Sequence, residues 1–216
     1  CEDAKFPIEA IREVGYEAVF AGQKTYNGVA ILSRSPITDI QRGIPGYDDP
    51  QQRVIAASIG GVRVVNAYFP NGQAPGSEKF AYKLDWLVHL TAWLKQELMT
   101  SAQLCLIGDY NIAPTDADAH PDWKETIHVS PPERAAFAAL EALGLCDVFR
   151  KFEQPEKSFS WWDYRMNAFR RNFGLRIDHI LASTTLADRC TACTIDKAPR
   201  TLERPSDHTP VIATFS

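Results

Sequence analysis

The sequence predicts two packed β-sheets covered by helices, an α/β or α+β sandwich. Short runs rich in β-branched residues are interspersed with longer helical patterns, and two neighbouring runs are separated by a tight turn. The 216 residues are 45% hydrophobic and 11% aromatic, which is enough apolar material for a substantial core. Because no Pro/Gly/Ser-rich linker divides the chain, residues 1–216 are expected to form a single domain.

The N-terminal half is predicted to form a helix, four strands and a second, longer helix. The first helix is expected at residues 6–14, and the four β-rich runs lie at residues 16–21, 28–33, 54–59 and 62–69. Gly60 and Gly61 alone separate the last two runs, which is typical of a two-residue hairpin. The longer helix should begin after Ser77, a good N-cap, because apolar residues then recur at spacings of three and four.

The C-terminal half adds a buried strand, a helix and three further strands. The run at residues 104–111 is apolar at first and is expected to be a strand. A helix follows Ser130, with proline in its first turn, and should end near Gly144. After an aromatic and arginine-rich segment, the last strands are expected at residues 177–183, 190–195 and 211–215.

The net charge and the cysteine content argue against several classes of protein. The net charge of −4 argues against a protein coated in basic charge, although it leaves room for a local basic groove. The five cysteines are an odd number, and Cys190 and Cys193 form a C-x-x-C without a second pair, so neither a disulfide framework nor a metal or redox site is expected. No apolar run approaches bilayer length and no signal peptide is recognisable, so we expect a cytoplasmic protein without a membrane partner.

Polar residues stand at the ends of several predicted strands. The apolar run that starts at Leu104 ends in Gly-Asp-Tyr-Asn, where Asp109 and Asn111 should share a face because alternate side chains of a strand do. Asp178 lies in an apolar strand, where an unpaired carboxylate would be costly. Tyr68, Asn71, Asp207 and His208 complete the set. Each residue alone has an ordinary reading, as a turn residue, a surface imidazole or a rim tyrosine.

Together, these residue types suit the hydrolysis of a phosphodiester bond. Such a site needs one carboxylate that takes a proton from water and another that holds a divalent cation. It also needs neutral or cationic donors that face the phosphate oxygens. Because all of these groups stand at predicted strand ends, a phosphodiesterase explains the set better than a series of unrelated turns.

A segment near residue 165 combines aromatic and basic side chains. Four arginines, Arg165, Arg170, Arg171 and Arg176, alternate there with tryptophan, tyrosine and phenylalanine. This combination indicates phosphate contacts and stacking faces for a nucleic acid. The alternative interpretation is a solvated arginine-rich loop over an aromatic core.

Six motifs follow one another along the chain: GVAILSR, NAYFPNG, GDYNIAPTD, SFSWWDYR, GLRIDHILAS and SDHTPV. They resemble the successive motifs of the exonuclease III family of class II AP endonucleases, within the endonuclease/exonuclease/phosphatase superfamily. The resemblance covers essentially the whole chain. It implies a four-layered α/β sandwich, in which two mixed β-sheets pack face to face between helices and the active site lies at one edge.

The resemblance also implies roles for individual residues. The catalytic residues it implies are Asp109 as activator of the attacking water, Asn111 as its orienting neighbour, His208 as phosphate contact, Asp178 as the partner of that imidazole, and Tyr68 as a hydroxyl donor. The implied cofactor is Mg²⁺, with Mn²⁺ as a substitute, held by Asp109, Asn111 and Asp207. The implied substrate-binding residues are Asn71, Trp161, Arg165, Arg170, Arg171, Leu175 and Ile177. Among them, Trp161, Leu175 and Ile177 would form an apolar pocket for a flipped-out sugar that lacks its base.

The chain departs from the family pattern at its start. The family begins with a strand that bears a Trp-Asn motif and then a Leu-Gln-Glu motif whose glutamate is the main metal ligand, and neither motif is present. We therefore expect a chain that is truncated at its N-terminal side relative to the family and binds Mg²⁺ weakly.

The function expected from the sequence is a Mg²⁺-dependent DNA phosphodiesterase of base-excision repair that acts as a monomer. It would cut double-stranded DNA 5′ to abasic sites and trim blocked 3′ ends, and its 3′-5′ exonuclease and 3′-phosphatase activities are left unranked. Two alternatives stay open. One is a phosphatase of the same superfamily that acts on a small phosphoester, and the other is an inactive or fragmentary DNA-binding relative.

Overall fold

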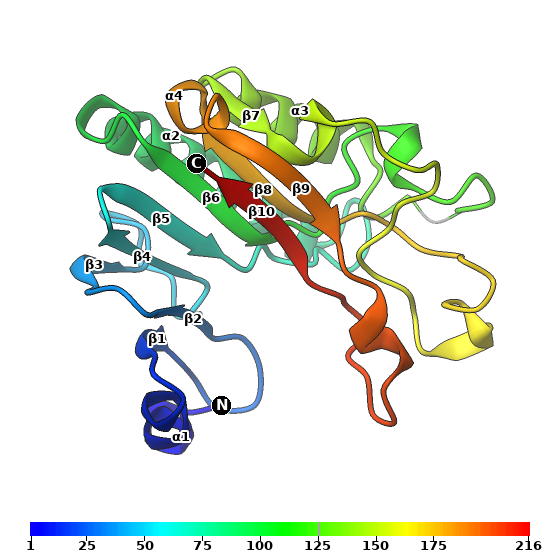
Figure 1. Cartoon of the computed structure of the whole chain (residues 1–216). Coiled ribbons are helices and arrows are strands. Elements are labelled where there is room, and N and C mark those ends of the chain that lie inside the picture. Colours follow the sequence, from blue (N-terminus) through cyan, green and yellow to red (C-terminus); the bar gives the residue numbers. More distant parts are fainter. Residues whose placement is uncertain (125) are drawn as a thin grey trace.

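A six-stranded mixed sheet forms the centre of the fold (Figure 1). The computed structural model describes residues 1–124 and 126–216. In spatial order the strands are β3 (Thr38–Arg42), β4 (Val54–Ile59), β5 (Val62–Ala67), β6 (Leu104–Asp109), β8 (Asp178–Ser183) and β7 (Leu145–Asp147). β5 and β6 are parallel, and the other neighbours in this sheet are antiparallel. A parallel pair needs a long crossover, and α2 (Glu78–Thr100) provides it.

The helices α2 and α3 (Pro131–Glu141) cover one face of this sheet. Ser77 caps α2, since its side chain accepts a hydrogen bond from the Phe80 amide at 3.1 Å. Ser130 and Glu133 form a capping box at the start of α3. Trp86 and Leu90 of α2 are fully buried against the apolar face of β4, β5 and β6. None of the helices that the structure describes combines the length and apolar character needed to cross a bilayer.

The opposite face of the sheet carries two separate antiparallel pairs. One pair is β1 (Glu17–Ala21) with β2 (Val29–Ser33), and the other is β9 (Cys190–Ile195) with β10 (Val211–Phe215). The short helices α1 (Ile8–Glu13) and α4 (Thr184–Ala187) contact β1 and β8 respectively. The α/β class is confirmed, with one correction of detail. The second layer is not a mixed sheet, because each of its pairs consists of two antiparallel strands.

One predicted nucleic-acid contact is wrong, because Arg176 is buried with 1% of its surface exposed. Its guanidinium forms ion pairs of 2.7 Å with both Asp118 and Asp147, the arrangement that a buried charge requires. It also donates to Nδ1 of His179 at 3.0 Å, and Nε2 of His179 donates to the Ile112 carbonyl at 2.9 Å. Arg176 therefore fixes the loop after β6 to the start of β8.

Candidate active site

Two carboxylates meet where the central strands β6 and β8 lie side by side. Asp109 ends β6, Asp178 begins β8, and the antiparallel register places them directly opposite each other. Directly opposed residues of an antiparallel pair project to the same face. On its other side, β6 approaches the end of β5 closely at Gly108, because a Cβ at that position would lie 2.1 Å from the Ala67 carbonyl oxygen and the φ of Gly108 is +134°.

His208 joins the two carboxylates from the segment that precedes β10. Its Nδ1 lies 2.9 Å from Asp178 Oδ2, and its Nε2 lies 3.9 Å from Asp109 Oδ2. Burial alone would lower the pKa of His208. The hydrogen bond and charge of Asp178, with the charges of Asp109 and Asp207, outweigh burial and raise this pKa to about 9. The imidazole is therefore a cation at neutral pH.

The pKa of Asp109 is also raised, but here burial is the main cause. Burial, and then the neighbouring charge of Asp178, raise the pKa of Asp109 to about 7, although His208 and the Asn111 amide oppose the shift. Asn111 donates its backbone amide to Asp109 Oδ1 at 2.8 Å and its side-chain amide to Oδ2 at 3.0 Å. A carboxylate with a pKa near neutrality is suited to accept a proton from water.

Tyr68 and Asn71 approach the carboxylates from the loop after β5. The Asn71 side-chain amide donates to Asn111 Oδ1 at 3.2 Å. Burial and the nearby charge of Asp109 raise the pKa of Tyr68, so its hydroxyl keeps its proton at neutral pH. The described structure thus brings together all five residues expected to be catalytic.

The three residues expected to hold a metal, Asp109, Asn111 and Asp207, differ in the contacts that they make. The ligand atoms of Asp109, Asp178 and His208 lie within 4.8 Å of one another. Asp207 instead accepts a hydrogen bond from the indole Nε1 of Trp161 at 3.0 Å, and Asn111 turns its amide nitrogen toward Asp109. Because both oxygens of Asp178 face His208, Asp109 is the carboxylate best placed to offer an oxygen to a hard cation.

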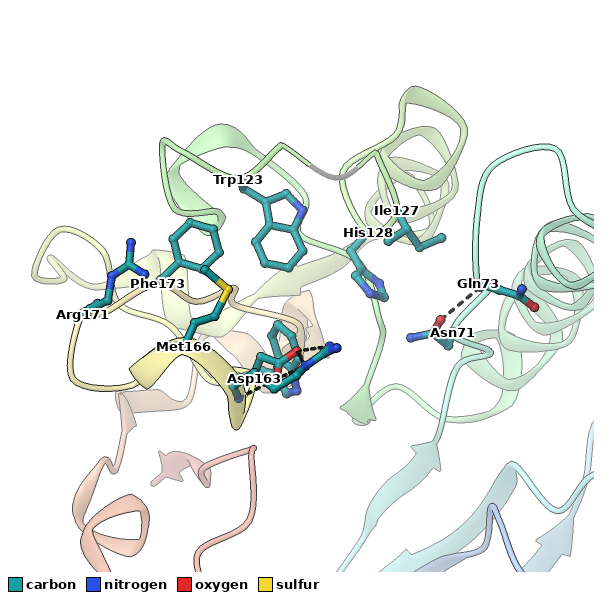
Figure 2. Close-up of a pocket in the computed structure, with 12 residues that line it drawn as sticks. Asn71, Gln73, Trp123, Ile127, His128, Asp163, Met166, Arg171 and Phe173 are labelled. Carbon is teal, nitrogen blue, oxygen red and sulfur yellow. Dashed lines mark hydrogen bonds and ion pairs between the residues drawn. The ribbon is translucent and has the colours of Figure 1, made fainter.

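A cavity of about 450 Å³ opens beside these residues. Figure 2 shows Trp123 and Phe173 on one side of it and Asn71 on the other, with His128 between them. Trp161 also lines the cavity, as expected. Trp123 and Phe173 were not among the expected residues, and the only sequence signal for them is that they are aromatic residues in polar segments.

Leu175 and Ile177 do not form the pocket as expected. They are 0% and 2% exposed, and neither lines the cavity. Leu175 pairs with Trp161 through backbone hydrogen bonds of 3.0 Å, and both residues pack beneath that indole. They support the pocket wall from behind, because Leu175 pairs with the backbone of Trp161 and both side chains pack in the same apolar cluster.

The three remaining arginines lie at or near the rim of the cavity. Arg165 and Arg171 line it, and Arg170 is exposed beside them. The guanidinium of Arg165 forms a 2.6 Å ion pair with Asp163, which gives its side chain a defined position. Met166 between them is 78% exposed and has a φ of +60°. This rim therefore presents cations and an apolar side chain to solvent.

A buried polar cluster behind the loops was not expected from the sequence. Lys83, Glu133 and His128 are 0%, 0% and 7% exposed. Burial lowers the pKa of Lys83, although Glu133 opposes the shift, and burial and the charge of Lys83 lower the pKa of His128 to about 4. Lys83 occupies an apolar position of α2, three residues after Phe80, and that mismatch was the available signal.

Comparisons with known proteins found a matching family, similar sequences and similar structures. Residues 3–208 match the Endonuclease/Exonuclease/phosphatase family. Exodeoxyribonuclease III of Haemophilus influenzae is 39% identical over an alignment 228 residues long, which covers 99% of this chain and 85% of that protein. The 3′ phosphatase NExo from Neisseria, solved with a product DNA hairpin, superposes with a TM-score of 0.97 at 46% identity and covers 100% of this chain and 85% of its own. An AP endonuclease from Archaeoglobus fulgidus gives 0.94 at 39% identity, with the same coverages.

Proposed function

Because this chain belongs to the endonuclease/exonuclease/phosphatase family, as a hydrolase of the exonuclease III and AP endonuclease type, we propose that it hydrolyses phosphoester bonds in double-stranded DNA. The proposed substrates are abasic sites and blocked 3′ ends, and the proposed cofactor is Mg²⁺. The proposal treats residues 1–216 as one domain that acts as a monomer. The observation that carries it is the contact of His208 with Asp178 beside Asp109, at the edge of an aromatic cavity.

Each residue of the site has a separate proposed role in the hydrolysis. Asp109, with a pKa of about 7, takes a proton from the attacking water, and Asn111 holds this carboxylate in place. The imidazolium of His208 and the protonated hydroxyl of Tyr68, both influenced by the charges of Asp109 and Asp207, would offer donors to phosphate oxygens. Asp178 keeps His208 charged and fixes its ring orientation.

The donor set also fits the divalent cation that the family uses. Mg²⁺ prefers oxygen ligands and usually takes one or two carboxylates while keeping several waters. Asp109 supplies such an oxygen, and we propose Asn111 and Asp207 as its neighbours. When bound, the cation stabilises charge on the phosphate as a Lewis acid.

The rim residues support DNA over a small phosphoester. Arg165, Arg171 and the exposed Arg170 suit a polyanionic backbone, and Trp123, Trp161 and Phe173 offer faces to a sugar or a base. A compact metabolite would leave most of this surface unused.

The test compares five substrates: duplex DNA with an abasic site, with a 3′-phosphate, with a plain recessed 3′ end, an intact control duplex, and a soluble inositol phosphate. Each is incubated with Mg²⁺ and with EDTA. We expect cleavage of the abasic and 3′-phosphate duplexes with Mg²⁺ only. Turnover of the inositol phosphate alone would contradict the proposal, and binding of DNA without cleavage of any substrate would favour the inactive relative.

A further inference from the structure

The buried ammonium group of Lys83 touches both loops that carry the active-site asparagines. Its Nζ donates to the backbone carbonyl of Asn111 at 2.7 Å and to that of Asn71 at 3.3 Å. Its third bond goes to Glu133, so all three donors of the ammonium are used. Glu133 holds Lys83 in place from α3, while Lys83 itself belongs to α2.

The carboxylate of Glu133 also has its acceptor positions occupied, two on each oxygen. Besides Lys83, its carboxylate accepts the backbone amides of His128 and Ser130, each at 3.1 Å, and the Ser130 hydroxyl at 2.6 Å. His128 Nδ1 donates to the same Asn111 carbonyl at 2.8 Å. Both lone pairs of that carbonyl are therefore occupied, one by Lys83 and one by His128.

The loop that this cluster holds has an uncommon backbone conformation. Asn111 has a φ of +50°, in the left-handed region that residues other than glycine adopt rarely, asparagine more readily than most. The bonds of Lys83 and His128 to its carbonyl help to hold this conformation. Gly72, which follows Asn71, packs against the Lys83 side chain, because a Cβ there would lie 3.0 Å from Lys83 Cδ.

We propose that Lys83 is a positioning residue for the reaction, whose buried ammonium fixes the Asn71 and Asn111 backbones and so holds their carboxamides beside Asp109. The side chains form a continuous path, from Asn71 Nδ2 to Asn111 Oδ1 at 3.2 Å and from Asn111 Nδ2 to Asp109 Oδ2 at 3.0 Å. Loss of the ammonium removes the lysine donor from the Asn71 carbonyl and leaves the Asn111 carbonyl bonded to His128 alone, so the two amides can drift from the phosphate site. This inference rests on the proposed function.

The test separates positioning from stability with three variants. Lys83→Met removes the donors and leaves Glu133 as an unpaired buried charge, so it should lower both the melting temperature and kcat. Glu133→Gln keeps the capping box. The double variant Lys83→Met with Glu133→Gln removes both charges and should recover most of the lost stability. The kcat of the double variant should stay about 10- to 100-fold below wild type, with KM for DNA changed by less than about threefold.

A partly buried ion pair elsewhere on α2 provides the control. Arg63 of β5 and Glu97, near the C-terminal end of α2, form a 2.6 Å pair away from both asparagine loops. Arg63→Met should lower the melting temperature and leave kcat at the wild-type value. Recovery of kcat together with stability in the Lys83/Glu133 double variant would overturn the proposal, because a purely structural role predicts that recovery.

A readout without substrate keeps the test independent of the proposed function. In the metal-free protein, the side-chain amide ¹⁵N–¹H signals of Asn71 and Asn111 should shift or broaden in Lys83→Met and in the double variant, but not in Arg63→Met. Unchanged signals in the double variant would refute the positioning role. A wild-type protein that cleaves none of the DNA substrates would refute the proposed function, and the amide signals would then decide this inference alone.

Discussion

Replacement of Asp178 by asparagine should remove the charge of His208. The carboxylate accepts from His208 Nδ1 with both oxygens, at 3.0 and 2.9 Å, and its bond and charge are the main causes that raise the pKa. Asparagine keeps the shape and offers a neutral oxygen. Burial lowers the pKa of His208, and the hydrogen bond and charge of Asp178 would no longer oppose it. The pKa of His208 should therefore fall from about 9 to 6.5 or below.

The size of this change follows from the structure. At pH 7.5 the charged fraction of His208 should drop from nearly all molecules to about a tenth. Because the folded protein raises the pKa, the pair stabilises the fold fully below about pH 6.5, and this contribution is lost as the pH rises through about 9. The contribution is at most roughly 3 kcal/mol, since each pKa unit corresponds to about 1.4 kcal/mol.

The assay is an NMR titration of the His208 ring signals in the metal-free protein, with urea unfolding measured at pH 6 and pH 10. The control variant is Asp116→Asn, because Asp116 is exposed and pairs with Arg134. The variant Asp178→Asn should lose stability at pH 6 and little at pH 10. A His208 pKa that stays near 9 in this variant would refute the reasoning, since Asp178 could not then be its cause.

Two further predictions concern DNA contact and the close approach of β6 to the end of β5 at Gly108. Replacement of both Arg170 and Arg171 by alanine should weaken DNA binding and flatten the slope of log K against log salt by up to about two units; an unchanged slope in fluorescence anisotropy would place both side chains away from the DNA. Gly108→Ala should destabilise the fold by about 3 kcal/mol, because the new Cβ would overlap the Ala67 carbonyl in a positive-φ conformation. Wild-type stability of that variant in denaturant unfolding would show that β6 does not approach the end of β5 at Gly108 as closely as described.

Elements with a strong hydrophobic pattern could be predicted from the sequence, and those without one could not. The run at residues 54–59 became β4 and the helix after Ser77 became α2. β3 (Thr38–Arg42) was missed because four of its five residues are exposed, so an edge strand of this kind shows no apolar alternation. β7 (Leu145–Asp147) has three residues, too few for any periodicity.

For the candidate site too, the important residues could be identified from the sequence, whereas their arrangement in space could not. Asp109 and Asp178 stood out because each carboxylate interrupts or ends an apolar strand. Their direct opposition depends on the pairing of β6 with β8, which are about seventy residues apart in sequence and joined by no local pattern. The burial of Leu175 and Ile177 behind Trp161 is likewise a tertiary feature. A sequence motif identifies residues of a site, but it does not show whether a residue lines the cavity or packs behind the residues that do.

We propose that this chain hydrolyses DNA phosphoesters with Asp109 as its general base. The most direct measurement is single-turnover cleavage of an abasic duplex and of a 3′-phosphate duplex with Mg²⁺, in the wild-type protein and in Asp109→Asn. The substitution keeps the side-chain shape and removes proton acceptance. The account predicts a rate lower by at least roughly a hundredfold, with DNA affinity largely retained. A near-normal rate in Asp109→Asn would contradict it.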